Sequence, residues 1–137
     1  MGLNDKVKLI PRELKSDERG SFLKVITGNE ENLPPRTGEV YVTMGDLGQV
    51  RGNHYHLQTS EWFTLIQGTA VAVVADPVTG ERLQWTLDGR DPVTLYVPAG
   101  IAHAFKNPEG SHNPMLLIVY ADQQYQPLDT VQFPVIS

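Results

Sequence analysis

Short runs rich in β-branched and aromatic residues, separated by glycines and prolines, are the feature that most constrains how this chain can fold. Its 12 glycines and 10 prolines are spread along all 137 residues and are not collected in a linker. Runs of this composition between turn residues are typical of β-strands, and no helical period longer than a turn or two interrupts them. The runs that we expect to form strands are 21–27, 39–44, 49–56, 62–67, 70–75, 82–87, 94–97, 103–107 and 115–121.

The regular turns between these runs predict an all-β domain that closes into a barrel or a sandwich. Closure pairs or covers strand edges that would otherwise be exposed. The segment "DPVTGE" (76–81) is expected to be a hairpin loop, because proline favours the start of a turn and glycine accepts positive φ. The chain has the length of one domain and shows no repeat or linker, so we expect a single domain over 1–137.

The composition excludes several classes of function. With 11 Lys and Arg against 16 Asp and Glu, the formal net charge is −5, and the interspersed signs disfavour nucleic acid or an anionic membrane as main partner. The absence of cysteine excludes disulfides, thiolate metal ligands and a cysteine nucleophile. We find no signal peptide and no apolar run long enough to cross a bilayer, so we expect a cytoplasmic protein.

The segment "RGNHYHLQTSE" (51–61) concentrates two of the four histidines. On a strand, His54 and His56 point to one side and Tyr55 to the other. If the strand at 62–67 pairs antiparallel with this one, Glu61 can lie beside both imidazoles. Two imidazoles and a carboxylate suit a divalent ion such as Zn, Fe, Mn, Ni or Cu. The alternative for this segment alone is a solvated histidine pair on an edge strand.

A second segment, "VPAGIAHAFKN" (97–107), contributes a further histidine. Its proline and glycine form a turn, after which His103 enters an apolar strand. Taken alone, such a histidine is usually a hydrogen-bonded core or surface residue. Its importance comes from its combination with the first segment.

Together these segments resemble the cupin superfamily. Residues 48–68, "GQVRGNHYHLQTSEWFTLIQG", match the first cupin motif at every fixed position, and 98–107, "PAGIAHAFKN", match the core of the second. One departure is Pro92, which stands where that second motif has a glycine. The resemblance implies a cupin jelly-roll β-barrel, with one cupin domain over 1–137, and a homodimer. It also implies one divalent metal ion, with zinc as first candidate and iron, manganese or nickel as alternatives, bound by His54, His56, Glu61 and His103.

Other segments relate the chain to cupins that act on nucleotide-linked 4-keto sugars. "DERGSF" (17–22) and "RGNHYH" (51–56) resemble the 3,5-epimerase of the rhamnose pathway and the 3,4-ketoisomerases of amino-sugar pathways. "RGNHYH" and "PLDTVQFPV" (127–135) are also similar to the C-terminal cupin of bifunctional capsular polysaccharide enzymes, which binds zinc and is linked to C3 epimerisation of a UDP-4-keto-6-deoxy sugar. The resemblance therefore implies an epimerase or isomerase of a nucleotide-linked 4-keto-6-deoxy sugar in polysaccharide or deoxysugar biosynthesis.

The resemblance also implies roles for individual side chains. His54 corresponds to the catalytic histidine of the epimerase motif, yet a ligating imidazole cannot remove a proton through the same nitrogen. Val119 falls about where the catalytic tyrosine of the epimerase would be, so we nominate the adjacent Tyr120. Arg51 is a candidate for binding the substrate diphosphate, because a guanidinium matches phosphate oxygens. The further candidates for substrate binding are Tyr41, Trp62 and Tyr125.

Two other functions are consistent with a cupin metal site. One is an iron- or nickel-dependent dioxygenase of a small organic substrate, and the other is a non-catalytic sugar-binding cupin. "RGNHYH" with Arg51, and the segment "DERG", favour the sugar-nucleotide enzyme, because an oxygenase needs neither of them.

Overall fold

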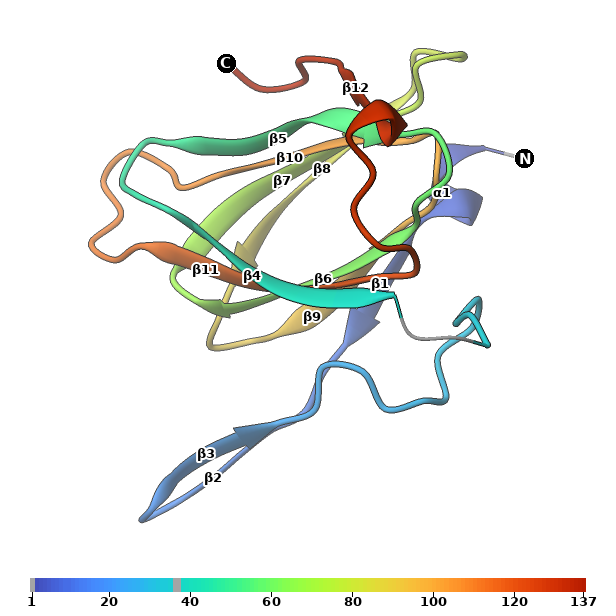
Figure 1. Ribbon diagram of the computed structural model, residues 1–137. Helices are drawn as coiled ribbons and strands as arrows, with labels where there is room; N and C mark the ends of the chain where they lie inside the picture. Colours follow the sequence, from blue (N-terminus) through green and yellow to red (C-terminus); the bar gives the residue numbers. More distant parts are fainter. Residues whose placement is uncertain (1, 36–37) are drawn as a thin grey trace.

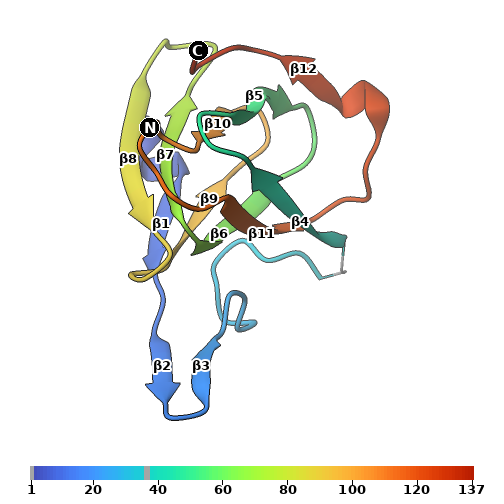
Figure 2. The ribbon, with the colours of Figure 1, turned by 90° about the vertical axis from the view of Figure 1, so that its left-hand side faces the viewer.

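The computed structural model describes residues 2–35 and 38–137, which form two five-stranded antiparallel sheets and a two-stranded hairpin. The two large sheets face each other, and the hairpin projects away from them (Figures 1 and 2). In spatial order, the first sheet consists of β1 (Lys8–Pro11), β9 (Val93–Val97), β6 (Glu61–Gln67), β11 (Met115–Ala121) and β4 (Glu39–Gly45). The second consists of β12 (Thr130–Gln132), β5 (Val50–His56), β10 (Ala102–Lys106), β7 (Thr69–Ala75) and β8 (Arg82–Asp88). The hairpin consists of β2 (Leu14–Asp17) and β3 (Gly20–Leu23).

Helical structure in the described residues is limited to short segments. The α-helix α1 covers Leu3–Lys6 and the 3-10 helix η1 covers Pro127–Asp129. Within the described ranges, none of the helical segments has the length and apolar character that crossing a membrane requires. The all-β prediction is therefore confirmed.

Most of the expected strands are present, with ends shifted by a residue or two. The clearest exception is 21–27, where pairing ends at Leu23. Val25 and Ile26 instead line an apolar groove together with Trp62, on the outer face of the first sheet. The strands β1, β2 and β12 were not predicted, because each has only three or four residues and no extended apolar pattern. The hairpin loop expected at 76–81 joins β7 to β8.

The conditional pairing of the histidine strand with the next strand was wrong. β6 pairs with β9 and β11, whereas β5 pairs with β10 and β12 in the other sheet. The loop 57–60 thus crosses from one sheet to the other and does not close a hairpin. As a result, Glu61 approaches the histidines from across the interior.

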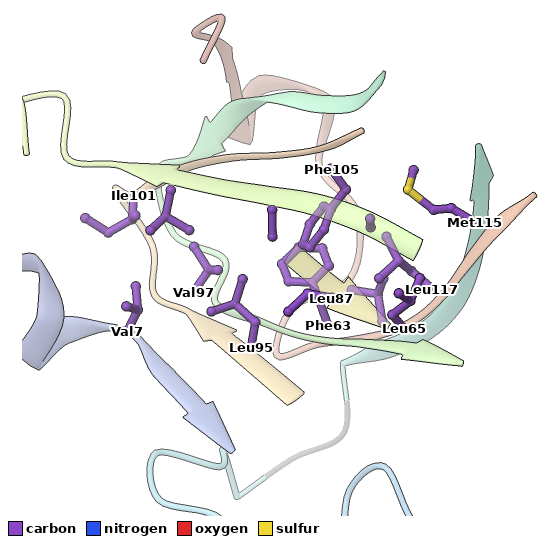
Figure 3. Packing of buried hydrophobic residues seen from close by; sticks show 14 of the residues in the cluster. Val7, Phe63, Leu65, Leu87, Leu95, Val97, Ile101, Phe105, Met115 and Leu117 are labelled. Carbon is purple, nitrogen blue, oxygen red and sulfur yellow. The ribbon is translucent and has the colours of Figure 1, made fainter. Parts of the chain in front are cut away.

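The hydrophobic core fills the space between the sheets (Figure 3). β11 shows the pattern most simply, since Met115, Leu117 and Val119 are all buried while the intervening residues face outward. Alternate residues of a strand point to opposite faces, so one face of β11 packs into the core. Phe63 and Phe105 pack against each other with their rings tilted and their centroids 4.7 Å apart, and both also line the cavity that contains the histidines. These two rings separate the apolar core from the polar site.

Candidate metal centre

Three histidines from two neighbouring strands meet at the inner surface of the second sheet. His54 and His56 come from β5, and His103 of β10 is the direct antiparallel partner of His54. The ring of His54 lies 4.9 Å from each of the other two rings, between centroids. One ring nitrogen from each residue lies within 4.8 Å of the others, a spacing at which a single cation can contact all three. The sequence prediction that these imidazoles share one side is thus matched by their placement.

Glu61 contacts this cluster from the first sheet. Its Oε1 atom lies 3.0 Å from Nε2 of His56 and 3.5 Å from Nε2 of His103. Glu61 is 3% exposed, and its Oε1 atom is a buried polar atom for which no well-aligned hydrogen-bond donor is found in the described residues. A buried carboxylate oxygen without a donor is costly unless a cation or a charged group compensates it. The donor set of nitrogen and oxygen atoms therefore fits a divalent metal ion.

Burial controls the charge of two of the imidazoles. It lowers the pKa of His103 to about 4, although the charge of Glu61 acts in the opposite direction. Burial, with a smaller contribution from the charge of His56, also lowers the pKa of His54. Both imidazoles are neutral at pH 7, so they need not lose a proton before a metal ion can bind.

The other two members of the cluster behave as an ion pair. Burial alone would lower the pKa of His56, but the contact with Glu61 and the charge of Asp129 outweigh burial and raise it. Burial alone would raise the pKa of Glu61, but His56, His103 and Tyr41 outweigh it and lower the pKa. In the metal-free protein, the positive charge of His56 thus compensates the negative charge of Glu61. A bound cation would take over this compensation.

Three further contacts orient the members of the cluster. Tyr41 of β4 donates a hydrogen bond of 2.5 Å from its hydroxyl to Oε2 of Glu61. Nδ1 of His103 lies 3.3 Å from the carbonyl oxygen of Ile101, and Nδ1 of His56 lies 3.3 Å from Oγ1 of Thr130. Hydrogen bonds at the far nitrogen fix the tautomer and ring orientation of a metal-binding histidine. In the described part of the chain, His54 has no such contact at either nitrogen.

A cavity of about 600 Å³ opens over the cluster. All four predicted metal ligands line it, together with the predicted substrate-binding residues Arg51, Tyr41 and Tyr125. Nε of Arg51 donates a 2.9 Å hydrogen bond to Oγ1 of Thr43 on the facing sheet. The cavity thus has a polar wall at the histidines, a cationic side chain near them and exposed aromatic side chains.

Two nominated residues do not reach this cavity. Trp62 and Tyr120 lie on the outer face of the first sheet, where their rings pack with centroids 5.5 Å apart and line a separate groove. The physical reason is that successive side chains of a strand point to opposite faces. Glu61 and Phe63 point inward, so Trp62 between them points outward. Val119 also points inward, so Tyr120 points outward. The nominations of Trp62 for substrate binding and Tyr120 for catalysis in this cavity are corrected accordingly.

Sequence reasoning missed Asp129 and Thr43. Asp129 accepts hydrogen bonds from the amide of Gln58 and the hydroxyl of Thr59, and its Oδ2 lies 3.8 Å from Nδ1 of His56. It comes from η1, far from His56 in the sequence, so only tertiary structure brings the two together. Thr43 shares the inward face of β4 with Tyr41, and this alternation would have indicated it once Tyr41 was placed.

Comparisons with known proteins agree with this architecture. The family described as polysaccharide biosynthesis C-terminal domain matches residues 15–133. No curated protein sequence was found to match. Among solved structures, ChmJ, a 3'-monoepimerase from Streptomyces bikiniensis in complex with dTDP-quinovose, is 20% identical with a TM-score of 0.81, over 93% of this chain and 69% of its own.

Two further solved structures are similar in fold. The dTDP-6-deoxy-D-glucose-3,5-epimerase from Legionella pneumophila Philadelphia 1 is 20% identical with a TM-score of 0.82, over 96% of this chain and 74% of its own. The capsular polysaccharide assembling protein CapF from Staphylococcus aureus is 25% identical with a TM-score of 0.67, over 91% of this chain, which spans only 35% of CapF. These likenesses confirm the cupin jelly roll, and the chain belongs to the polysaccharide biosynthesis C-terminal domain family.

Proposed function

We propose that this protein is a metal-binding epimerase or isomerase of a nucleotide-linked 4-keto-6-deoxy sugar. The observation that carries the proposal is the cluster of His54, His56, His103 and Glu61 in the wall of a cavity of about 600 Å³. A cavity of this size accommodates a small organic ligand. The similar structures from Streptomyces and Legionella are sugar-nucleotide epimerases, which supports the same substrate class.

Within the cluster, we assign the metal to His56, His103 and Glu61. Contacts below 4 Å connect Glu61 to these two histidines, and both have an orienting contact at their far nitrogen. Zinc is the first candidate, with iron, manganese and nickel as alternatives. When bound, a divalent cation would supply the cavity with positive charge that stabilises an enolate oxygen.

His54 is then available as the base. Its lowered pKa leaves a lone pair at pH 7, and no orienting contact occupies either of its nitrogens in the described residues. Epimerisation next to a ketone requires a base to take the proton from the α-carbon, while the electrons of the C–H bond move towards the carbonyl oxygen. Return of a proton to the opposite face of that carbon inverts its configuration. This assignment removes the conflict between the two roles predicted for His54.

Three other side chains complete the proposed site. Tyr41 lines the cavity and its hydroxyl contacts Glu61, so it replaces Tyr120 as the candidate proton donor. We assign Arg51 to the substrate diphosphate, because its side chain lines the same cavity and a guanidinium matches phosphate oxygens. Tyr125, which is exposed at the cavity, offers an aromatic surface for the sugar or the base.

The decisive experiment measures solvent exchange and metal content together. Protein purified without nickel affinity is incubated in D₂O with a UDP- or dTDP-linked 4-keto-6-deoxyhexose, and deuterium next to the ketone is followed by NMR. We expect exchange by the wild type, loss of exchange with retained metal for His54→Gln, and loss of both for His56→Ala. Absence of metal after attempted reconstitution would contradict the ligand assignment. Oxygen uptake by iron-loaded protein without deuterium exchange would favour the dioxygenase, and sugar-nucleotide binding without exchange would favour the non-catalytic cupin.

We also propose a homodimer that forms through the outer face of the first sheet. Val40, Val42 and Met44 are exposed in a row on β4, which is one of the two edge strands of this sheet. Contiguous exposed apolar side chains mark interaction surfaces. Analytical ultracentrifugation should therefore give twice the monomer mass, and Val42→Asp should give the monomer. A monomeric wild type would contradict this proposal.

A further inference from the structure

Strand β5 contains a β-bulge between the two parts of the candidate site. His103 of β10 pairs with His54, but the next residue, Ala104, pairs with Gly52, so Asn53 is an extra residue in β5. Gly52 and Asn53 both have positive φ, at 102° and 61°. A bulge of this kind reverses the alternation of the strand on one of its sides.

The reversal decides where Arg51 points. In a regular strand, Arg51 would share a face with Tyr55, which packs on Phe133 outside the barrel. Because of the extra residue, Arg51 pairs with the inward-facing Phe105 and lines the same cavity as the histidines. From there it reaches Thr43 on the opposite sheet. The bulge is therefore the reason that a cationic side chain and the imidazoles occupy one cavity.

Asn53 holds the bulge by binding a distant segment of the chain. Its Oδ1 accepts hydrogen bonds from the amides of Val135 at 2.8 Å and Ile136 at 3.0 Å, and its Nδ2 donates to the carbonyl oxygen of Ile136 at 2.8 Å. Its own carbonyl accepts a further bond from the amide of Phe133. Both acceptor sites of this side chain and one of its two amide protons thus form hydrogen bonds with segment 133–136.

Asparagine suits this position for two physical reasons. It tolerates the left-handed region better than most residues with a Cβ atom, and its amide supplies both a donor and an acceptor. Gly52 is constrained differently, because a Cβ atom there would lie 2.8 Å from the carbonyl oxygen of His103. The bulge is thus held by segment 133–136 and packed closely against the backbone of His103 in the neighbouring strand β10.

We propose that Asn53 is a positioning residue that, through segment 133–136, keeps Arg51 directed into the cavity for recognition of the substrate diphosphate. The inference rests on the proposed function for the identity of the ligand. The orientation of Arg51 does not depend on it. The side chain of Asn53 does not line the cavity and is bonded to segment 133–136 instead, so it acts through the conformation of β5.

The first test reads the conformation without any ligand. In Asn53→Gly, positive φ remains accessible but the side-chain hydrogen bonds to Val135 and Ile136 are lost. We expect faster hydrogen exchange at these two amides and loss of the NOE between Hε of Arg51 and the methyl group of Thr43. Asn53→Asp keeps the acceptor for these amides but loses the donor to the carbonyl oxygen of Ile136, so it should disturb both signals less than Asn53→Gly does. Persistence of the Arg51–Thr43 contact in Asn53→Gly would overturn the proposal.

The second test uses UDP and dTDP as probes in calorimetric titrations. We expect Asn53→Gly to weaken binding about tenfold, the loss of one charge-assisted contact. In an Arg51→Ala background the same substitution should change Kd less than twofold, because the two residues act through one contact. Equal effects in both backgrounds would overturn the proposal.

Asp76→Ala is the matched control, because Asp76 also binds backbone amides, those of Val78 and Thr79, but away from the cavity. It should lower Tm without changing Kd. If the control weakens binding as much as Asn53→Gly, general destabilisation explains the effect and the proposal fails. If the wild type binds neither nucleotide, the proposed substrate class is contradicted, while the NMR comparison still decides the role of Asn53.

Discussion

Strands β11 and β5 show two different relations between sequence and structure. β11 pairs with β4 residue by residue along its whole length, and every second side chain from Met115 to Ala121 is buried. β5 is interrupted by the bulge at Gly52 and Asn53, and none of its residues is fully buried. The regular strand builds the core, whereas the irregular strand supplies two histidines and Arg51 to the cavity. Stability and ligand binding should therefore respond separately to changes in the two strands.

The largest expected effect is on metal binding, from the irregular strand. His56→Ala removes an imidazole that contacts Glu61, and we expect metal affinity to fall on the order of a thousandfold, since several ligands share a total of roughly 10–16 kcal/mol in structural zinc sites. Elemental analysis and competition with a chromophoric chelator measure this loss. The folded structure should persist, as judged by circular dichroism. Unchanged affinity would remove His56 from the ligand set.

A comparable change in β11 should affect stability instead. Leu117 is 0% exposed, so Leu117→Ala should lower the free energy of unfolding by about 3 kcal/mol through lost burial and the cavity left behind. Ile118→Ala, on the outer face of the same strand, is the matched control and should cost less. Urea denaturation measures both. Metal bound per folded molecule should stay the same, and a parallel loss of metal would show that the two regions are coupled.

The two regions should also differ in their response to acid. The pKa of His103 is about 4 in the folded protein, below the ordinary value of 6.5, so the unfolded state binds more protons between these limits. Its contribution to the stability of the metal-free protein is complete above pH 6.5 and is lost as pH falls to about 4, at most about 3 kcal/mol. Urea denaturation at several pH values measures this slope. His103→Leu should reduce it, whereas Leu117→Ala should shift the whole curve without changing its slope.

The smallest of these effects tests the bulge itself. Gly52→Ala places a Cβ atom 2.8 Å from the carbonyl oxygen of His103 at a φ of 102°, and we expect a loss of about 2 kcal/mol in stability together with weaker metal binding. Gly80→Ala is the matched control, because its φ is also positive, at 80°, but nothing lies within 4 Å of the added atom. It should cost less and leave metal binding intact. Equal effects on metal binding would show that the contact with His103 is unimportant.

Prediction from sequence succeeded where structure is local. The apolar runs of β6, β7 and β11 indicated strands because they are rich in β-branched and aromatic residues and are bounded by turn residues. In β11, burial also follows the two-residue period of a strand. The same alternation placed His54 and His56 on one face. It also indicated that neighbours in a strand, such as Glu61 and Trp62 or Val119 and Tyr120, face opposite sides. The errors at Trp62 and Tyr120 therefore arose because these residues were chosen by their position in a motif, and the alternation rule itself held.

The sequence by itself determined the β class, the inward and outward faces of regular strands and the chemical nature of the cluster, because these depend on composition and a two-residue period. Only the tertiary structure decided that Glu61 meets the histidines from the opposite sheet and that Asp129 lies beside His56. It also decided that Arg51 shares their cavity, since the bulge depends on bonds between Asn53 and residues 133–136. Such contacts join parts of the chain that are far apart in sequence, where no local pattern records which partners meet.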